Sequence, residues 1–317
     1  GINLRVFGNM YADLELFKKF TFRTNLGIDY IAGNARNMQL SYVSGYLNNP
    51  INKVTNYYNN SSNWVWSNTL SYQHTSDKHD VNAMVGTELF HHYDEGFWAS
   101  RQSFELEDIN YMYLDAGTGL KDNGGLASEY ALLSYFGKVN YAYASKYLVS
   151  MTLRYDGSSR FGKNNQFATF PAFSLGWRLN EEGFIKDNFE NISDLKVRLG
   201  WGQTGNSEIS NNATQTIFST NYAGGDPTWR SPDGTAYDLF GNKTGNLPSG
   251  YQKVQSGNDD LKWETTTQTN IGLDFGFYNQ KIFGSIDYYI KDTKDILVQP
   301  AYIAVVGEGG NQWLNGA

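Results

Sequence analysis

The stretch that decides the fold is FTFRTNLGIDY, residues Phe20–Tyr30. Every second side chain from Phe20 onward is apolar or Thr, and the side chains between them are Thr, Arg, Asn, Gly and Asp. A period of two is typical of a strand with one apolar and one polar face. The alternation lasts eleven residues, whereas strands of globular proteins usually run about five or six. The stretch therefore predicts an unusually long strand.

The same alternation recurs along the rest of the chain. It is found at residues 6–16, 64–75, 81–91, 133–143, 147–156, 171–180, 195–203, 263–277 and 282–291. A tilted strand needs about 9–11 residues to cross a bilayer. The sequence therefore predicts an all-β fold of about ten antiparallel strands, each long enough to cross a membrane.

The connections between the predicted strands alternate between short and long. Tight turns are predicted at 17–20, 76–80, 144–146 and 278–281. Long links are predicted at 31–62, 92–131, 157–169, 205–261 and from 295 onward. Residues 181–193, EEGFIKDNFENIS, stand where a tight turn is expected and are predicted to hold a helical turn. Short turns on one side and long loops on the other are typical of outer-membrane barrels, in which the turns are periplasmic.

Composition excludes several other classes of protein. No apolar run among the 317 residues approaches the roughly 18 that a spanning helix needs. The absence of Cys excludes disulfide scaffolds, zinc ribbons and thiol catalysis. A formal net charge of -7 argues against a nucleic-acid partner, which would require a basic surface. A β-barrel remains compatible with these numbers, because it crosses a bilayer on alternating residues.

A soluble β-sandwich would also show alternating strands, with its charged face in water. The uniform strand length and the long loops on one side favour the barrel. So do the aromatic residues near strand ends, as in an interfacial girdle. These are Trp64, Trp66, Tyr143, Tyr147, Trp177, Trp201, Trp263 and Phe277. The polar inward face suits a wide barrel to which the chain contributes part of the wall. A secreted, soluble all-β carbohydrate-binding module is the alternative.

Five collinear motifs resemble the barrel signatures of SusC/RagA-type TonB-dependent outer-membrane transporters of the Bacteroidetes. They are LSYFGKVN (133–140), LRYDGSSRFG (153–162), FPAFSLGW (170–177), LKVRLGWGQTGN (195–206) and LKWETTTQTNIGLD (261–274). The resemblance spans most of the chain and is weakest in the predicted loops.

This resemblance implies a plugged barrel of the 22-strand class in the bacterial outer membrane. It implies import of glycan oligomers or peptides, energised by TonB, with a SusD-like lipoprotein as a lid on the external loops. The chain lacks a TonB box, a plug and closing strands, so TonB would act through a missing N-terminal part. We therefore expect residues 1–317 to be a partial transmembrane barrel domain cut from a longer chain. Its long extracellular loops are expected near 31–62, 92–131, 205–261 and 295–317.

No catalytic, cofactor-binding or metal-binding residues are predicted, so the chain is expected to be a carrier and not an enzyme. His91 and His92 would point to opposite faces of a strand, so they cannot easily share a metal. Glu181 and Glu182 would likewise separate, which does not support a paired-carboxylate glycosidase site. The segment Asp156–Gly162 could suggest calcium or phosphate, but a strand-to-loop turn explains its Asp, Gly and Ser residues.

The aromatic residues of the external loops are the candidate functional surface. They are Trp98, Tyr111, Tyr113, Tyr222, Trp229, Tyr237, Tyr251 and Trp313. Flat rings beside amides suit sugar rings, which have apolar faces and hydroxyl edges. They equally suit a protein lid, because Tyr and Trp anchor interfaces. A third interpretation is that these rings form small cores within the loops.

Overall fold

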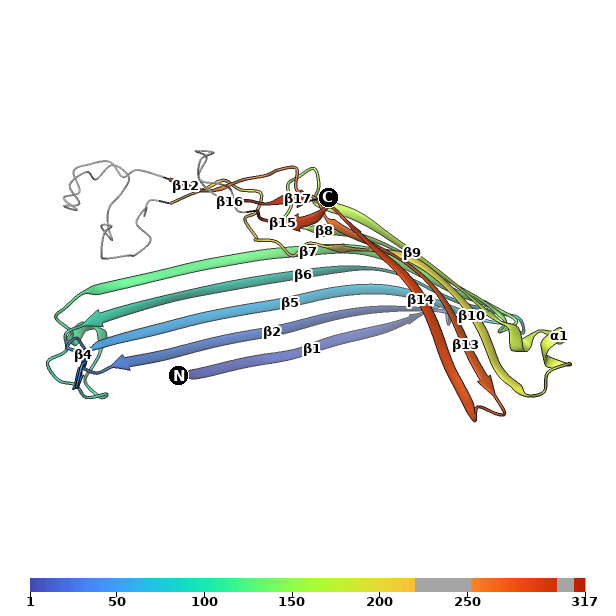
Figure 1. The fold of residues 1–317 in the computed structure, drawn as a ribbon, viewed down its shortest axis with the longest axis horizontal. Coiled ribbons are helices and arrows are strands. Elements are labelled where there is room, and N and C mark those ends of the chain that lie inside the picture. Colours follow the sequence, from blue (N-terminus) through green and yellow to red (C-terminus); the bar gives the residue numbers. More distant parts are fainter. Residues whose placement is uncertain (220–251, 301–310, 317) are drawn as a thin grey trace. The chain divides into compact units, whose positions relative to one another are not determined.

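The computed structural model describes residues 1–219, 252–300 and 311–316. Ten strands form one sheet in the order β1-β2-β5-β6-β7-β8-β9-β10-β13-β14, so each strand follows its neighbour along the chain (Figure 1). Their bounds are β1 Ile2–Leu16, β2 Phe20–Gln39, β5 Lys53–Thr75, β6 His79–Gln102, β7 Lys121–Tyr143, β8 Tyr147–Ser158, β9 Phe167–Arg178, β10 Ile192–Asn206, β13 Glu264–Phe277 and β14 Ile282–Lys294. The prediction of about ten antiparallel strands is confirmed. No helix of the described part is long and apolar enough to cross a membrane.

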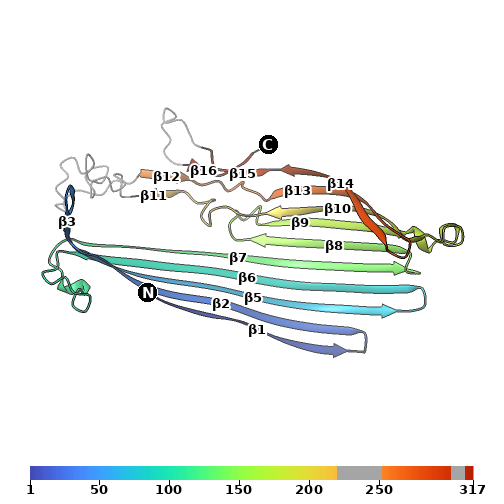
Figure 2. The ribbon, with the colours of Figure 1, turned by 60° about the horizontal axis from the view of Figure 1, so that its bottom comes forward.

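The chain divides into two compact units. Unit 1 comprises Gly1–Leu70 and Gly86–Leu133, and unit 2 comprises Ser71–Val85 and Ser134–Ala317. In each unit we call the strand ends that meet in tight turns the turn side, and the opposite ends the loop side. In unit 1 the β1–β2 turn lies on the turn side, and the hairpin of β3 (Tyr42–Ser44) and β4 (Leu47–Asn49) lies on the loop side (Figure 2).

Four strands are much longer than expected. β2, β5, β6 and β7 contain 20, 23, 24 and 23 residues. Much of the predicted loops 31–62 and 92–131 is therefore strand, and the part outside the ten strands shrinks to 40–52 and 103–120. The reason is physical: where a sheet rises beyond lipid, both faces meet water, so the backbone ladder continues without apolar alternation.

The loop side of unit 2 carries short strands. β11 (Ile217–Ser219), β12 (Gln252–Ser256) and β16 (Asn311–Gln312) form one small sheet, and β15 (Ile296–Val298) pairs with β17 (Leu314–Gly316). The predicted links 205–261 and 295–317 thus contain strand in their described parts. The link at 157–169 shrinks to 159–166.

The two faces of the unit 1 sheet differ as the alternation predicts. On one face Met10 lies opposite Leu26, and the two side chains are 75% and 47% exposed. On the other face Arg5 donates two hydrogen bonds to Asp29, at 2.8 and 2.9 Å. Large apolar side chains left uncovered beside a polar face are what a lipid-facing wall requires.

Unit 2 repeats this division into an apolar and a polar face. Leu153, Leu175 and Leu199 are exposed side chains of one face. The opposite face carries Arg198, whose guanidinium donates to Asp274 at 2.8 and 2.9 Å and to Asp287 at 3.2 Å. We refer below to the apolar face and the polar face of each unit.

The predicted tight turns are confirmed. Ala144 and Ser145 have φ of 51° and 56°, and the turns at 17–19 and 278–280 also contain positive φ. Such left-handed residues match the twist of two-stranded hairpins. The predicted helical turn in 181–193 is also present, as η2 (Leu179–Glu181) and α1 (Gly183–Lys186).

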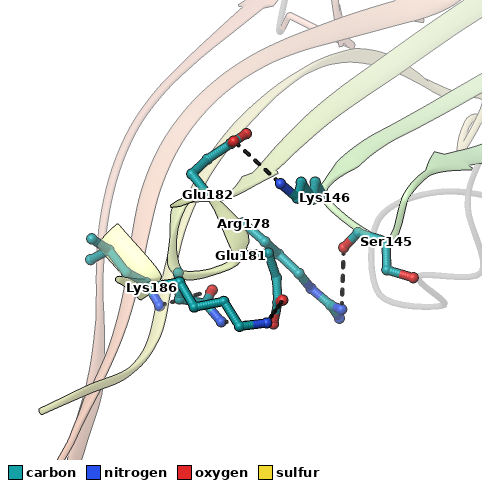
Figure 3. A network of polar contacts seen from close by, with 8 residues as sticks. Ser145, Lys146, Arg178, Glu181, Glu182 and Lys186 are labelled. Atoms are coloured by element: carbon teal, nitrogen blue, oxygen red, sulfur yellow. Dashed lines mark hydrogen bonds and ion pairs between the residues drawn. The ribbon is translucent and has the colours of Figure 1, made fainter. Parts of the chain in front are cut away.

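A polar network fixes this exceptional turn (Figure 3). Glu182 accepts hydrogen bonds from Tyr147 Oη at 2.7 Å and Trp177 Nε1 at 3.1 Å, and Lys146 Nζ lies 3.4 Å away. The Tyr147 hydroxyl first, then the Trp177 indole, and then Lys146 lower the pKa of the Glu182 carboxyl below its ordinary value. Tyr147 and Trp177 also stack at 6.3 Å. Both rings lie at strand ends, where the sequence predicts the aromatic residues of an interfacial girdle.

The buried cores lie on the loop side, beneath the irregular segments. In unit 2 the core contains Phe161, Phe170, Ile209, Ala213, Leu261 and Trp263. Trp263 was predicted to be a girdle residue, which is wrong: it precedes β13 and is buried, and its Nε1 donates to the Gln166 carbonyl at 3.0 Å. The 156–162 segment is the predicted strand-to-loop turn, and it places Phe161 in this core.

Candidate functional site

On the loop side of unit 1, one buried amide holds the 103–120 segment in place. Asn52 Nδ2 donates to the Phe104 carbonyl at 2.8 Å, and its Oδ1 accepts from the Phe104 amide at 2.6 Å. Glu107 accepts from Asn52 Nδ2 at 2.7 Å and from the Ser41 amide at 3.0 Å. Ser41 first and then Asn52 lower the pKa of the Glu107 carboxyl. The segment is therefore tied to both ends of the 40–52 link, on either side of the β3–β4 hairpin.

The same segment presents two of the predicted aromatic residues. Tyr111 and Tyr113 are 61% and 59% exposed on either side of Met112, which is completely buried. Arg36 donates to the Met112 carbonyl, and its guanidinium lies 4.7 Å from the centroid of the Tyr113 ring. Val54, Phe104 and Met112 form the core beneath. Tyr111 and Tyr113 are thus exposed rings on a segment fixed from below.

Trp98 was expected in a loop but lies within β6, where it lines a hollow of about 800 Å³ in unit 1. We call this the Trp98 hollow. Its lining residues include Asn3, Arg5, Tyr57, Asn59, Asp94 and Trp98 on the polar side, together with the apolar residues Ile31, Phe97 and Leu126. The polar-side positions follow the parity of the polar face, which in β1 and β2 carries Arg5 and Asp29. The hollow therefore lies on the polar face of the wall.

The remaining predicted aromatic residues do not join this hollow. Trp313 lies between β16 and β17 and packs partly buried against the unit 2 core, as the loop-core interpretation expects. Tyr222, Trp229, Tyr237 and Tyr251 lie outside the described residues. Their roles, and a ligand or lid contact at any of the eight, stay predictions.

Sequence reasoning missed the neighbours of Trp98 in the hollow. Tyr57 and Asn59 fell in the predicted loop 31–62, and Asp94 fell in 92–131. The available signal was the parity of the flanking strands: continuing β5 and β6 in register places all three beside Trp98.

The histidines do not form a metal site. His92 lies between Asn63 and Asp94, with each ring nitrogen 2.6 Å from one side-chain oxygen. His91 stacks instead on Trp64 at 5.5 Å between ring centroids. Within the residues that the structure places, no group of three or more His, Cys, Asp or Glu side chains could hold a metal ion.

A second hollow, of about 530 Å³, lies on the polar face of unit 2. Lys196, Arg198, Asn140, Gln268 and Asn270 line it. Arg198 is held by two carboxylates, so its charge is compensated within the sheet. This hollow extends the polar face toward the turn side.

A sheet of ten long antiparallel strands with an uncovered apolar face and a polar opposite face is the wall of an outer-membrane β-barrel. Residues 4–316 match the family described as TonB dependent receptor-like, beta-barrel, and the chain belongs to that family. Its location is the bacterial outer membrane.

Several known proteins are similar to this chain. TonB-dependent receptor SusC of Bacteroides thetaiotaomicron is 36% identical over 247 residues, which are 77% of this chain and 22% of SusC. TonB-dependent receptor P3 of Formosa agariphila is 34% identical over 240 residues, 76% of this chain and 22% of that protein. The RagAB peptide transporter structure superposes with a TM-score of 0.84 at 25% identity, over 99% of this chain and 32% of that one.

The chain spans about a fifth of the length of the curated relatives it matches, 22% in each of these two. These relatives are named as receptors, and the matched structure is named as a transporter. The similarity therefore concerns the barrel wall.

Proposed function

We propose that this chain forms part of the wall of a TonB-dependent outer-membrane importer that carries glycan oligomers or peptides. The observation that carries the proposal is the two-faced sheet. Its apolar face suits lipid, and its polar face, with both hollows, suits the lining of a wide lumen. The structurally similar RagAB is named as a peptide transporter, and the similar SusC is named as a TonB-dependent receptor.

In this proposal the turn side is periplasmic and the loop side is extracellular. The aromatic rings of Tyr147 and Trp177 at the turn side then mark the inner membrane boundary. The irregular segments 40–52 and 103–120 face the medium. The SusC-like character of the chain supports this orientation, as does the restriction of tight hairpins to one side.

A SusD-like lipoprotein is the proposed partner on the loop side. The exposed Tyr111 and Tyr113 support this, because they stand on a segment that Asn52 and Met112 anchor. Rigid, exposed tyrosines are suitable anchors for a protein interface, since little conformational freedom is lost on binding. TonB itself would act through a part of the protein outside this chain.

The soluble carbohydrate-binding alternative does not fit the apolar face or the family. The proposal is tested in cells that carry the full-length protein as their only importer of this type. Radiolabelled pools of neutral oligosaccharides and of peptides are offered with and without a protonophore. We expect uptake of one pool and its loss when the protonophore is present. Uptake of neither pool, or uptake that the protonophore leaves unchanged, contradicts energised import.

A further inference from the structure

The indole of Trp98 packs closely on the neighbouring strand β7. A Cβ atom added to Gly124 would lie 2.8 Å from Nε1, 3.1 Å from Cε2 and 3.2 Å from Cζ2 of Trp98. Only glycine lets the ring approach the backbone of β7 this closely. The indole is therefore held against the backbone of β7, and Trp98 also lines the open hollow.

Two further glycines let polar side chains of the same hollow lie close to the sheet backbone. A Cβ on Gly96 would lie 2.7 Å from Asn59 Oδ1, and a Cβ on Gly33 would lie 2.7 Å from Asn3 Oδ1. Both amides thus lie across backbone that has no side chain of its own. The result is a shallow floor with one broad aromatic surface and amide groups beside it.

Two charged groups of the hollow, Arg5 and Asp94, already have partners. Arg5 makes its bidentate contact with Asp29, and its guanidinium also lies 5.6 Å from the centroid of the Phe7 ring. Asp94 Oδ2 lies 2.6 Å from His92 Nε2. A peptide carboxylate would have to compete with Asp29 for Arg5. Hydroxyl groups, in contrast, can donate to Asp94 and to the amide oxygens and accept from the amide NH₂ groups.

The hollow lies above the lipid. Within unit 1, Asn3 precedes Leu16, the last residue of β1, by 13 residues. At about 3.3 Å per residue and a tilt of about 40°, this distance raises it about 33 Å above the β1–β2 turn. The apolar band of such barrels is about 25 Å tall. The Trp98 hollow is therefore part of the outermost wall, where a ligand from the medium first meets the polar face.

We infer that the Trp98 hollow is a saccharide-binding subsite, in which a neutral sugar ring stacks on Trp98 and its hydroxyls bond to Asn3, Asn59 and Asp94. The inference rests on the proposed import function and selects glycan over peptide. The C–H groups on the flat face of a pyranose are apolar and slightly positive, so they are attracted to the negative face of an indole. A volume of about 800 Å³ lies within the range of small-molecule sites, roughly 300–1,000 Å³.

The test uses the purified full-length protein and two probe pools. One pool holds neutral oligosaccharides from partial hydrolysis of amylose, cellulose, xylan and mannan, and the other is a tryptic digest of casein. Retained molecules are identified and quantified by mass spectrometry for the wild type and for Trp98→Ala, Trp98→Phe and Gly124→Val. The control is Tyr58→Ala, since Tyr58 does not line the hollow and its ring packs on Phe97 at 5.3 Å on the opposite face.

We expect saccharide retention to fall at least about tenfold in Trp98→Ala and Gly124→Val, less in Trp98→Phe, and to stay within about twofold in Tyr58→Ala. Gel mobility without heating establishes that each barrel is folded, and the two Trp98 variants decide the outcome if Gly124→Val is not. Three results would overturn the subsite. The wild type could retain only peptides, it could retain neither pool, or it could retain saccharides to the same extent when Trp98 is replaced.

Binding and import are separable in this design. Saccharide binding that depends on Trp98, together with uptake that is absent or indifferent to a protonophore, would contradict import and leave the subsite standing. Energised uptake, together with saccharide binding that does not depend on Trp98, would contradict the subsite and leave the import proposal standing.

Discussion

Replacing Leu153 by Lys tests whether the apolar face meets lipid. In the proposed orientation, the stacked rings of Tyr147 and Trp177 mark the girdle on the turn side. A strand tilted by about 40° rises about 2.5 Å per residue, so the middle of a roughly 25 Å band lies about five residues further on. Leu153 is one of the two apolar-face residues of β8 nearest that level, the other being Met151, and its side chain is exposed.

A Lys at the bilayer midplane costs about 2–4 kcal/mol, which is roughly a 30- to 700-fold shift of the folding equilibrium. The matched control is Thr152→Lys, which places the same charge one residue away on the polar face, opposite Ala172. The assay is urea unfolding of the full-length protein in lipid vesicles, followed by gel mobility without heating. We expect Leu153→Lys to lose this free energy and Thr152→Lys to stay near wild type.

The pair Leu26→Lys and Asn25→Lys repeats the comparison in β2 of unit 1. Leu26 lies opposite Met10 on the apolar face, and Asn25 lies on the polar face, where it accepts a hydrogen bond from Asn9 at 3.1 Å. Equal tolerance of the two substitutions at both sites would refute a lipid-facing wall, while leaving the sheet itself intact.

Three further predictions concern the two ends of the wall. Asn52→Ala removes the two hydrogen bonds that the Phe104 backbone makes with this side chain. The local free energy of unfolding of residues 103–120 should fall by about 1–3 kcal/mol, which would appear as faster proteolysis within that segment. Unchanged cleavage would contradict the anchoring role. The lowered pKa of Glu182 means that its stabilising contacts are present above its ordinary pKa and lost as the pH falls through the lowered value. Glu182→Gln should therefore flatten the acid limb of turn-side stability measured by hydrogen exchange, and an unchanged acid limb would exclude this contribution. Deleting 224–250 should leave the barrel in the membrane but abolish uptake, and normal uptake would refute a role for that loop.

The number of strands, and which side chains of each strand lie on the apolar face, could be predicted from the sequence. A strand that crosses lipid must alternate apolar and polar side chains. Wherever one face meets hydrocarbon and the other meets a lumen, the sequence must carry a period of two. Phe20–Tyr30 shows this pattern, and β2 pairs with β1 in the register that the two apolar faces require. The tight turns were equally predictable, since little chain is available between two long strands.

The extension of the strands beyond the lipid could not be predicted from the same signal. Residues 56–60, NYYNN, are part of β5, yet they show no apolar alternation because both faces of the sheet there contact water. Trp98 was placed in a loop for this reason. The prediction for Trp263 was wrong for a different reason. An aromatic residue near a strand end fits a girdle, but the segment before β13 turns inward and buries Trp263 in the loop-side core.

The glycines near the hollow show which of its features the sequence alone could not predict. Gly33, Gly96 and Gly124 are visible in the sequence as interruptions of strand propensity, and each predicts a close approach of some neighbour. Which neighbour approaches depends on the register between strands whose contacting residues are far apart along the chain, by 26 residues for Trp98 and Gly124 and by 30 for Asn3 and Gly33. Because the register between β1 and β2 is set by the turn at 17–19 and by the lipid-facing side chains, the apolar face also determines which amide lies on which glycine of the polar face. The lipid requirement that fixes the fold therefore also positions the groups that we propose to bind sugar.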